Sequence, residues 1–252
     1  MTATRYQALL LDIDGTLVDQ SRKVSQKVME TIYQASQTIP IALVSSRRHM
    51  SVSDYAIQLG LDGFHISESG ARVFEQSTGA SYWKCTMPKD DAFEIVNFIE
   101  QQGYRLSVID GDRHVGTSGE ISAWCITSVS AVGLNPSQAK DLIQQFSNRP
   151  KVRGVAIPMQ DDVRKLRIVD FTSIKASKGI AARKWASLMG IDPELMIGVG
   201  DSYNDLALLE VCGLKVAMGN GAEELKLQAD FIAPPVDKDG VALVIEKFIL
   251  NR

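Results

Sequence analysis

The stretch Leu9-Leu10-Leu11-Asp12-Ile13-Asp14-Gly15-Thr16 decides the fold, because an apolar run of strand length ends abruptly in two aspartates one residue apart. Buried strands of parallel sheets are typically continuous apolar runs of this kind. In open α/β sheets, ligands bind just beyond the carboxyl ends of the strands. Two carboxylates therefore lie where chemistry usually occurs, although an ordinary strand entering an Asp-Gly turn has the same pattern.

The segments around this stretch alternate between strand and helix patterns. Before residue 82, helical spacing of apolar residues covers about 25–36 and 50–59, and apolar runs mark strands at 39–44 and 64–67. The alternation resumes after Ser177, with predicted helices at 178–189, 204–211, 223–228 and 241–250 and predicted strands at 196–199, 214–217 and 231–232. This alternation predicts a parallel sheet covered by helices.

The intervening segment has a different order of elements. Helix patterns at 90–102 and 137–147 are each followed by strand-like runs, at 105–109 and 121–127 and at 151–157 and 165–171. A helix followed by strands, repeated, is typical of an α+β domain. We therefore expect an α/β protein with a doubly wound, Rossmann-like core formed by residues 1–81 and 173–252, interrupted by an inserted α+β domain over 82–172.

Composition restricts the classes of partner. The 252 residues carry a formal net charge of -3, without the basic excess that nucleic acids or anionic membranes require. No apolar run approaches the ~20 residues that span a bilayer. The three cysteines are widely separated and show no ligand spacing, so we expect buried thiols in a reducing compartment, the cytoplasm. For the oligomeric state, a monomer and a small homo-oligomer both stay open.

Polar residues follow other strands of the predicted core as well. The second strand ends at Ser45, and a later one ends in Gly200-Asp201-Ser202-Tyr203-Asn204-Asp205. The carboxyl ends of parallel strands share one edge of a sheet, and the helix that begins near Lys178 starts at that edge too. We therefore expect one cluster of side chains, formed by Asp12, Asp14, Ser45, Lys178, Asp201, Asn204 and Asp205.

The charge of this cluster calls for a cation. Four ionised carboxylates carry about -4, and two like charges 4 Å apart repel by about 4 kcal/mol at an effective dielectric constant of 20. Lys178 alone cannot offset this repulsion, whereas a hard divalent cation with oxygen ligands, Mg²⁺, can. A site balanced in this way can accept a phosphate group, held also by Ser45 and by N–H groups at the starts of helices.

The same residue types fit phosphoryl transfer. A carboxylate can attack phosphorus to form an acyl phosphate, and a second carboxyl group can protonate the leaving oxygen and then activate water. Asp12 fits the nucleophile and Asp14 the acid–base group, because Asp14 lies one step farther out of the strand. The sequence has neither a Walker loop nor a complete dinucleotide fingerprint.

Four motifs in order resemble those of the haloacid dehalogenase superfamily: Asp12-Ile-Asp14-Gly-Thr16, Ser45-Ser46-Arg47, Ser-Lys178-Gly and Gly-Asp201-Ser-Tyr-Asn204-Asp205. The insert between the second and third motifs is similar to the α/β cap of the Cof-type (subfamily IIB) phosphatases. Ala217-Met218-Gly219-Asn220 and Asp239-Gly240-Val241 also look like the C-terminal signature of that subfamily.

The resemblance implies Asp12 as the nucleophile and Asp14 as the acid–base group with its main-chain carbonyl on the metal. It implies Mg²⁺ at Asp12, Asp14, Asp201 and Asp205, and a phosphate group held by Gly15, Ser45, Ser46, Lys178 and Asn204. Two positions depart from the usual pattern of the family: Ser46 replaces a glycine, and Ser69 replaces an asparagine found in many relatives.

Together these observations predict a Mg²⁺-dependent phosphatase that hydrolyses small phosphorylated metabolites, sugar phosphates first, through an aspartyl-phosphate. A sugar phosphomutase or phosphotransferase with the same nucleophile is the first alternative, and the fate of the phosphoryl group distinguishes the two. A non-catalytic protein that binds phosphorylated metabolites is the second, and the intact Asp12, Asp14, Lys178 and Asp201 speak against it. We expect neither a nucleic acid nor a membrane as partner.

Overall fold

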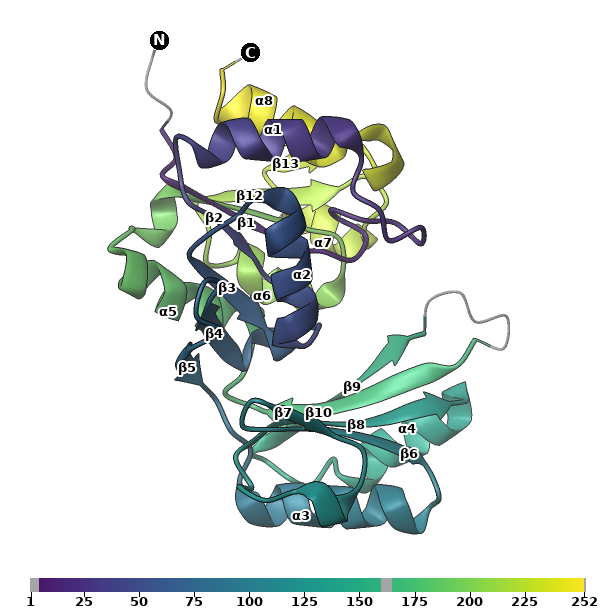
Figure 1. The fold of residues 1–252 in the computed structure, drawn as a ribbon. Coiled ribbons are helices and arrows are strands. Elements are labelled where there is room, and N and C mark those ends of the chain that lie inside the picture. Colours follow the sequence, from purple (N-terminus) through teal and green to yellow (C-terminus); the bar gives the residue numbers. More distant parts are fainter. Residues whose placement is uncertain (1–4, 160–164, 252) are drawn as a thin grey trace. The chain divides into compact units, whose positions relative to one another are not determined.

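The computed structural model describes residues 5–159 and 165–251, which form two compact units (Figure 1). One unit combines Met1–Trp83 with Ser177–Arg252, and the other is Lys84–Ala176. The sequence predicted these boundaries after residues 81 and 172. Both lie farther along the chain, because the strands Ser81–Lys84 (β5) and Arg167–Ser173 (β10) continue across the expected positions.

Five parallel strands form the sheet of the first unit, in the order β13-β12-β11-β1-β2. Their bounds are Ala8–Leu11 for β1, Ile41–Leu43 for β2, Met196–Gly200 for β11, Leu214–Met218 for β12 and Phe231–Ala233 for β13. The strand β1 lies between β11 and the edge strand β2. The loop that follows β1 therefore begins between the ends of its two neighbours, and the predicted α/β class is confirmed.

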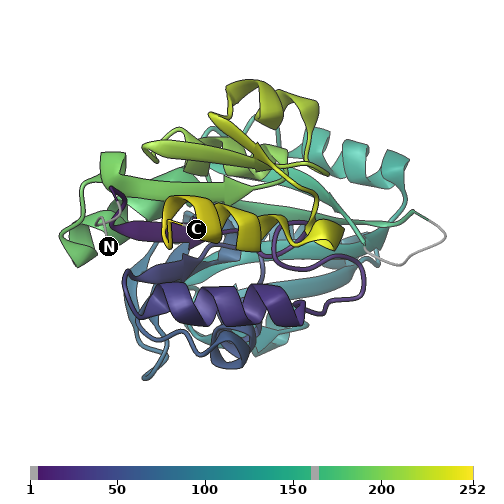
Figure 2. The same ribbon diagram turned by 90° about the horizontal axis from the view of Figure 1, so that it is seen from above.

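Helices cover the two faces of this sheet. Leu9 and Leu11 of β1 pack into a core with α1 (Gln26–Ser36), α2 (His49–Leu59) and α8 (Gly240–Phe248). Ala8 and Leu10 pack into the opposite core with α5 (Lys178–Met189) and α6 (Leu206–Leu209). Figure 2 shows α1 and α8 side by side over one face. Burial on both faces explains why β1 is apolar at every position.

A small second sheet, β3-β4-β5, extends this unit. Its β3 (Phe64–Ser67) begins beside the end of β2, where Val44 and Ile66 form a parallel bridge, and it pairs antiparallel with β4 (Arg72–Glu75). The sequence patterns predicted β3 but neither β4 nor β5. Between β3 and β4, the short helix Glu68–Gly70 holds three consecutive residues with positive φ, at 56°, 56° and 87°.

The second unit is an antiparallel sheet with helices on one face. Its strand order is β7-β6-β8-β10-β9. The strands are β6 (Arg105–Asp110), β7 (Arg113–Val115), β8 (Ile126–Leu134), β9 (Val152–Pro158) and β10. The helices α3 (Lys89–Gln101) and α4 (Pro136–Gln145) share an apolar core with these strands, as expected for an α+β domain.

The predicted strand at 121–127 is wrong for most of its length. The residues before Ile126 form a loop around the carboxylate of Asp110, which accepts the main-chain N–H groups of Ser122, Ala123 and Cys125 at 2.9 Å each. These groups bind a side chain instead of a neighbouring strand. The strand β8 starts only at Ile126, after the loop has closed.

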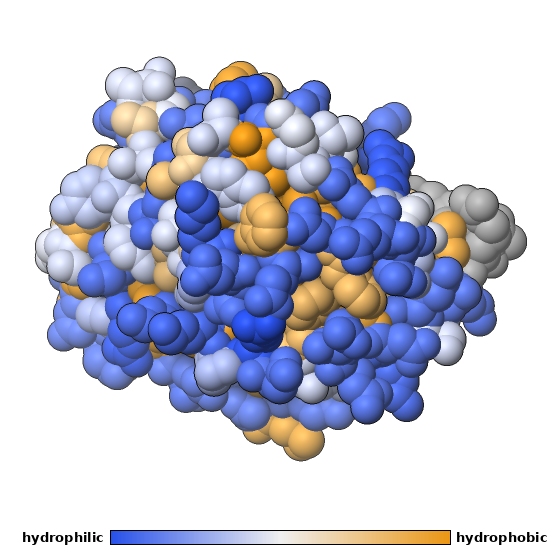
Figure 3. All heavy atoms as spheres, turned by 90° about the horizontal axis from the view of Figure 1, so that it is seen from below, coloured by the Kyte–Doolittle hydropathy of each residue, from blue (hydrophilic) through white to orange (hydrophobic). Residues whose placement is uncertain are grey.

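The face drawn in Figure 3 is mainly hydrophilic, with apolar side chains in separate groups. Within the part of the chain that the structure describes, no helix combines the length and the apolar character needed to cross a membrane.

Candidate active site

The first two aspartates follow β1 directly. Asp12 is buried at 4% exposure, and its N–H donates to the carbonyl of Val199 at the end of β11, at 3.0 Å. The chain then turns back, since the carbonyl of Ile13 accepts the N–H groups of Leu17 and Val18 at 2.9 and 3.0 Å. The turn holds the Asp12 carboxylate at the edge of the sheet.

Lys178 joins two of the carboxylates. Its Nζ donates to Oδ1 of Asp12 and to Oδ1 of Asp205, each at 2.5 Å, and all three side chains are buried. Lys178 is the first residue of α5, whose start is capped by Ser177 through the N–H of Ile180 at 3.1 Å. Burial alone would lower the pKa of Lys178, but attraction to Asp12 and Asp205 outweighs it and raises the pKa, so the side chain stays an ammonium.

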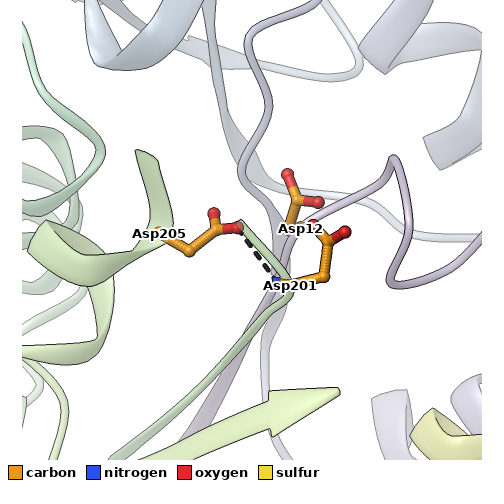
Figure 4. A group of neighbouring side chains, drawn as sticks. All are labelled: Asp12, Asp201 and Asp205. Carbon is orange, nitrogen blue, oxygen red and sulfur yellow. Dashed lines mark hydrogen bonds between the residues drawn. The ribbon is translucent and has the colours of Figure 1, made fainter. Parts of the chain in front are cut away.

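Asp205 also fixes the loop that follows β11. Its Oδ2 accepts the main-chain N–H of Asp201 at 3.1 Å, the bond drawn in Figure 4, and the N–H of Ser202 at 3.0 Å. Because Oδ1 accepts from Lys178, both oxygens of Asp205 have donors within the protein. Asp205 therefore connects the β11 loop to the start of α5.

Three carboxylates form a group that suits a cation. Asp12, Asp201 and Asp205 each offer an oxygen within 4.8 Å of the others (Figure 4). Among the described residues, Oδ1 of Asp201 is buried without a hydrogen-bond partner. Burial and the neighbouring Asp205 raise the pKa of Asp201 to about 7, and the same two causes raise the pKa of Asp12 well above its usual value. An all-oxygen donor set and an orphaned oxygen fit a hard divalent cation such as Mg²⁺.

Asp14 faces a different partner. Its two oxygens accept from Nε and Nη2 of Arg47 at 2.8 and 2.7 Å. Arg47 belongs to the second of the four motifs, but no sequence pattern assigned it a role. Together with the cations Arg47 and Lys178, the four aspartates carry a formal charge of -2, which one divalent cation would neutralise.

The other predicted site residues lie on the same loops. Ser45 is fully buried after β2, and its Oγ accepts the N–H of Arg47 at 3.1 Å. Ser46, next along the chain, is half-buried. Asn204 is exposed, and its Oδ1 accepts from Oγ of Ser202 at 2.6 Å, within its own loop. The structure thus brings Lys178 and three aspartates together and pairs Asp14 with Arg47. It links Asn204 to Asp205 only through the hydroxyl of Ser202, which also donates to Oδ2 of Asp205 at 3.2 Å.

Two glycines allow the loops of the site to lie close to one another. A Cβ on Gly15, whose φ is +80°, would lie 2.0 Å from Oδ2 of Asp201. A Cβ on Gly70, with φ +87°, would lie 2.2 Å from the carbonyl of Ser177, just before Lys178. At both positions a side chain is excluded by conformation and by contact.

Comparison with known families identifies this arrangement. The family model described as haloacid dehalogenase-like hydrolase matches residues 9–157 and 126–245. The chain belongs to the haloacid dehalogenase-like hydrolase family.

Relatives of this hydrolase match nearly the whole chain. The stress response protein YhaX of Bacillus subtilis is 25% identical over 271 residues, covering 96% of this chain and 93% of the relative. A putative phosphatase of Streptococcus pyogenes serotype M6 is 28% identical over 262 residues, covering 96% and 97%. The family and the phosphatase names among these relatives confirm the expectation of an enzyme, a hydrolase of the phosphoric monoester type.

Solved structures agree on the fold. A haloacid dehalogenase-like hydrolase from Bacteroides thetaiotaomicron has a TM-score of 0.84 at 21% identity, over 96% of this chain and 99% of that one. A subclass IIB sugar phosphatase has a TM-score of 0.79 at 20% identity, over 96% and 98%. These structures confirm the fold, and together with the family model and the phosphatase relatives they confirm the resemblance to a Cof-type hydrolase.

Proposed function

We propose that this hydrolase is a Mg²⁺-dependent phosphatase that cleaves small phosphate monoesters through an aspartyl-phosphate on Asp12. One observation carries the proposal: a buried lysine bridges two carboxylates, Asp12 and Asp205, while a third, Asp201, keeps a buried oxygen without a partner. Most buried polar atoms in folded proteins are paired, and a cation is one explanation for an unpaired carboxylate oxygen that lies beside two other carboxylates.

Asp12 is the proposed nucleophile. Its carboxylate oxygen attacks phosphorus, the ester P–O bond breaks, and the leaving oxygen takes a proton from Asp14. Water then attacks the phosphorus of the acyl phosphate and gives a proton to Asp14, so that Asp12 is regenerated and inorganic phosphate leaves. The bond from Lys178 to Oδ1 orients the Asp12 carboxylate for the first step.

The proposed phosphate site lies around the same residues. The ammonium of Lys178 and the hydroxyl of Ser45 supply a charge and a donor, and Gly15, Ser46 and Asn204 complete the proposed set. Arg47, which follows β2, holds the Asp14 carboxylate in place through two hydrogen bonds. Positioning and charge carry most of the catalysis in phosphoryl transfer.

Asp12, Asp201 and the main-chain carbonyl of Asp14 would hold Mg²⁺, together with Asp205. The bound ion would offset the negative charge of the carboxylates and of the phosphate group as they approach. Because both oxygens of Asp205 already accept from Lys178 and from main-chain N–H groups, its contribution is to orient Asp201 as much as to bind metal.

For the substrate we propose a small phosphorylated metabolite, and a sugar phosphate first. The structural likeness to a subclass IIB sugar phosphatase supports a sugar phosphate. A phosphoglycolate phosphatase of Methanobrevibacter smithii, 25% identical over 245 residues, supports a small organic phosphate more generally. The unpaired thiols of Cys85, Cys125 and Cys212 support our placement in the cytoplasm.

The test is phosphate release from a panel of sugar phosphates, phosphoglycolate and nucleotides, with Mg²⁺ and with EDTA. We expect release with Mg²⁺ that EDTA abolishes, and a loss of about 10⁴-fold or more in D12N with its circular dichroism unchanged. Transfer of the phosphoryl group to a second sugar would favour the phosphotransferase alternative. Inactivity on every ester with Mg²⁺ present would contradict the proposal.

A further inference from the structure

Asn220 links two loops that come from different strands. It follows β12, and its Nδ2 donates to the main-chain carbonyl of Gly15 at 2.8 Å. Its Oδ1 accepts the N–H of Val236, also at 2.8 Å. With one donor bond and one acceptor bond to main-chain groups, the orientation of the amide is fixed at both ends.

The neighbours of Asn220 hold the β11 loop. The N–H of Ala222 donates to the carbonyl of Asp201 at 2.8 Å. A Cβ on Gly221 would lie 2.7 Å from that same carbonyl oxygen, so the backbone of the β12 loop contacts Asp201 directly. Residues 219–222 therefore attach to the loop that carries Asp201 and, through Asn220, to the turn that carries Asp12 and Asp14.

The strand order explains why a side chain makes this link. The sheet runs β12-β11-β1, so the loop after β12 adjoins the end of β11 but not the end of β1. The side chain of Asn220 extends past the β11 loop to Gly15. There the Gly15 backbone contacts the Asp201 carboxylate, since a Cβ would lie only 2.0 Å from its Oδ2.

We propose that Asn220 is a positioning residue for the metal: it holds the Gly15 turn against Asp201 and thereby sets the separation of the Asp12 and Asp201 carboxylates. The proposal rests on the proposed function, because it takes these carboxylates as the ligands of Mg²⁺. Groups that orient metal ligands typically contribute about 10–100-fold to metal affinity. Asn220 contributes to Mg²⁺ affinity by fixing the distance between Asp12 and Asp201, which lie on two different loops.

The experiment is titration calorimetry with Mg²⁺ on the full chain. We expect N220A to weaken Mg²⁺ binding about 10–100-fold relative to the wild type. V236P removes the main-chain N–H that orients Asn220. Val236 is the first residue of a short helix, a position where proline is favoured. We expect V236P to weaken Mg²⁺ binding as well, but less than N220A does. If N220A does not fold, V236P carries the test.

The matched control is N135A, which removes another exposed asparagine with a main-chain hydrogen bond, the cap of α4 in the second unit. Mg²⁺ binding should be unchanged in N135A even though its unfolding temperature in EDTA falls. Wild-type binding by N220A and V236P would overturn the role of Asn220 alone. A wild-type protein that binds no Mg²⁺ would overturn the proposed function as well.

Discussion

The guanidinium of Arg47 donates to both carboxylate oxygens of Asp14, from Nε at 2.8 Å and from Nη2 at 2.7 Å. Such a forked pair fixes the plane of a carboxylate, which a lysine cannot do. The guanidinium is itself held, since it lies over the ring of Tyr55 at 5.1 Å from the centroid and donates to Oγ of Ser51 at 3.3 Å. The proposed acid–base group therefore depends on a residue that follows a different strand.

Replacing Arg47 should affect turnover more than substrate affinity. In R47A the Asp14 carboxylate loses both fixed donors, and we expect kcat to fall about 10²-fold, the usual cost of a misplaced catalytic group. R47K keeps the charge but not the fork, so its kcat should lie between R47A and the wild type. Steady-state kinetics on the best ester of the panel measures the effect.

S51A is the matched control for Arg47. It removes only the 3.3 Å contact to the guanidinium and leaves the pair with Asp14 intact, so kcat should change little. A rise of KM in R47A with an unchanged kcat would contradict the positioning role and would indicate a substrate contact instead.

The sequence predicted that Asp12 and Lys178 lie in one cluster, but it did not predict that Asp14 pairs with Arg47. Asp12 and Lys178 are 166 positions apart, yet in a parallel sheet the carboxyl ends of strands and the starts of returning helices share one edge. Which way a side chain points after a strand has ended depends on the loop conformation, which no periodicity encodes. Arg47 and Asn204 both lie in such loops, and their contacts could not be predicted.

The same distinction applies to the fold. Core strands such as β1 are buried on both faces, so their apolar runs identified them. The short strands β4 and β5 come after a turn of three residues with positive φ. Glu68 and Ser69 are not residue types that commonly adopt positive φ, so the sequence did not indicate the turn or the strands after it. The predicted strand at 121–127 is wrong before Ile126, because the carboxylate of Asp110 binds main-chain N–H groups there.

Gly70 should be far less tolerant of substitution than Gly79. Both have positive φ, at +87° and +68°, so alanine strains the backbone at either position. Only at Gly70 does the new Cβ meet main-chain atoms, 2.2 Å from the carbonyl of Ser177. Because that residue caps α5, the collision displaces Lys178. We expect G70A to be less stable than G79A by about 1–3 kcal/mol, the usual cost of overpacking.

Urea unfolding of G70A and G79A measures this difference in stability. Independently, kcat reports whether the collision at Gly70 displaces Lys178. G79A should keep the wild-type kcat, since nothing lies within 4 Å of its new Cβ. Equal stability and equal kcat in both variants would show that α5 shifts without cost and that the Gly70 contact does not fix Lys178.

Magnesium should stabilise the protein more as the pH rises. Burial and repulsion from Asp205 raise the pKa of Asp201 to about 7 without metal, from an ordinary 3.8. The proton on folded Asp201 contributes stability that is complete below about pH 4 and is lost as the pH rises through about 7. Mg²⁺ displaces this proton, so its effect on the unfolding temperature should increase from pH 5 to pH 8. D201N should reduce the increase, and the remainder comes from Asp12, whose pKa is also raised. An increase as large in D201N as in the wild type would contradict Asp201 as a ligand.

His65 should make stability depend on pH in the opposite direction. It is fully buried on β3, and its Nδ1 accepts the N–H of Leu43 at 3.1 Å, so a proton on Nδ1 would set two donors against each other. Burial lowers the pKa of His65 from 6.5 to about 4. The unfolded chain therefore binds the proton first, and stability present above pH 6.5 is lost as the pH falls towards 4, by up to about 3 kcal/mol.

H65N tests this prediction, because an asparagine oxygen can accept the Leu43 N–H without titrating. At pH 7.5 we expect H65N to be less stable than the wild type, because it lacks the imidazole ring whose centroid lies 6.0 Å from that of Phe74. On acidification H65N should lose little further stability. Urea unfolding in EDTA between pH 4.5 and 7.5 measures the gap between wild type and variant, which should close as the pH falls. Between about pH 4 and 7, Asp201 lowers and His65 raises the free energy of unfolding as the pH increases. The stability of the wild type should therefore depend on pH less than that of either single variant, D201N or H65N. Parallel curves for wild type and H65N would mean that His65 takes up its proton without cost in the folded state.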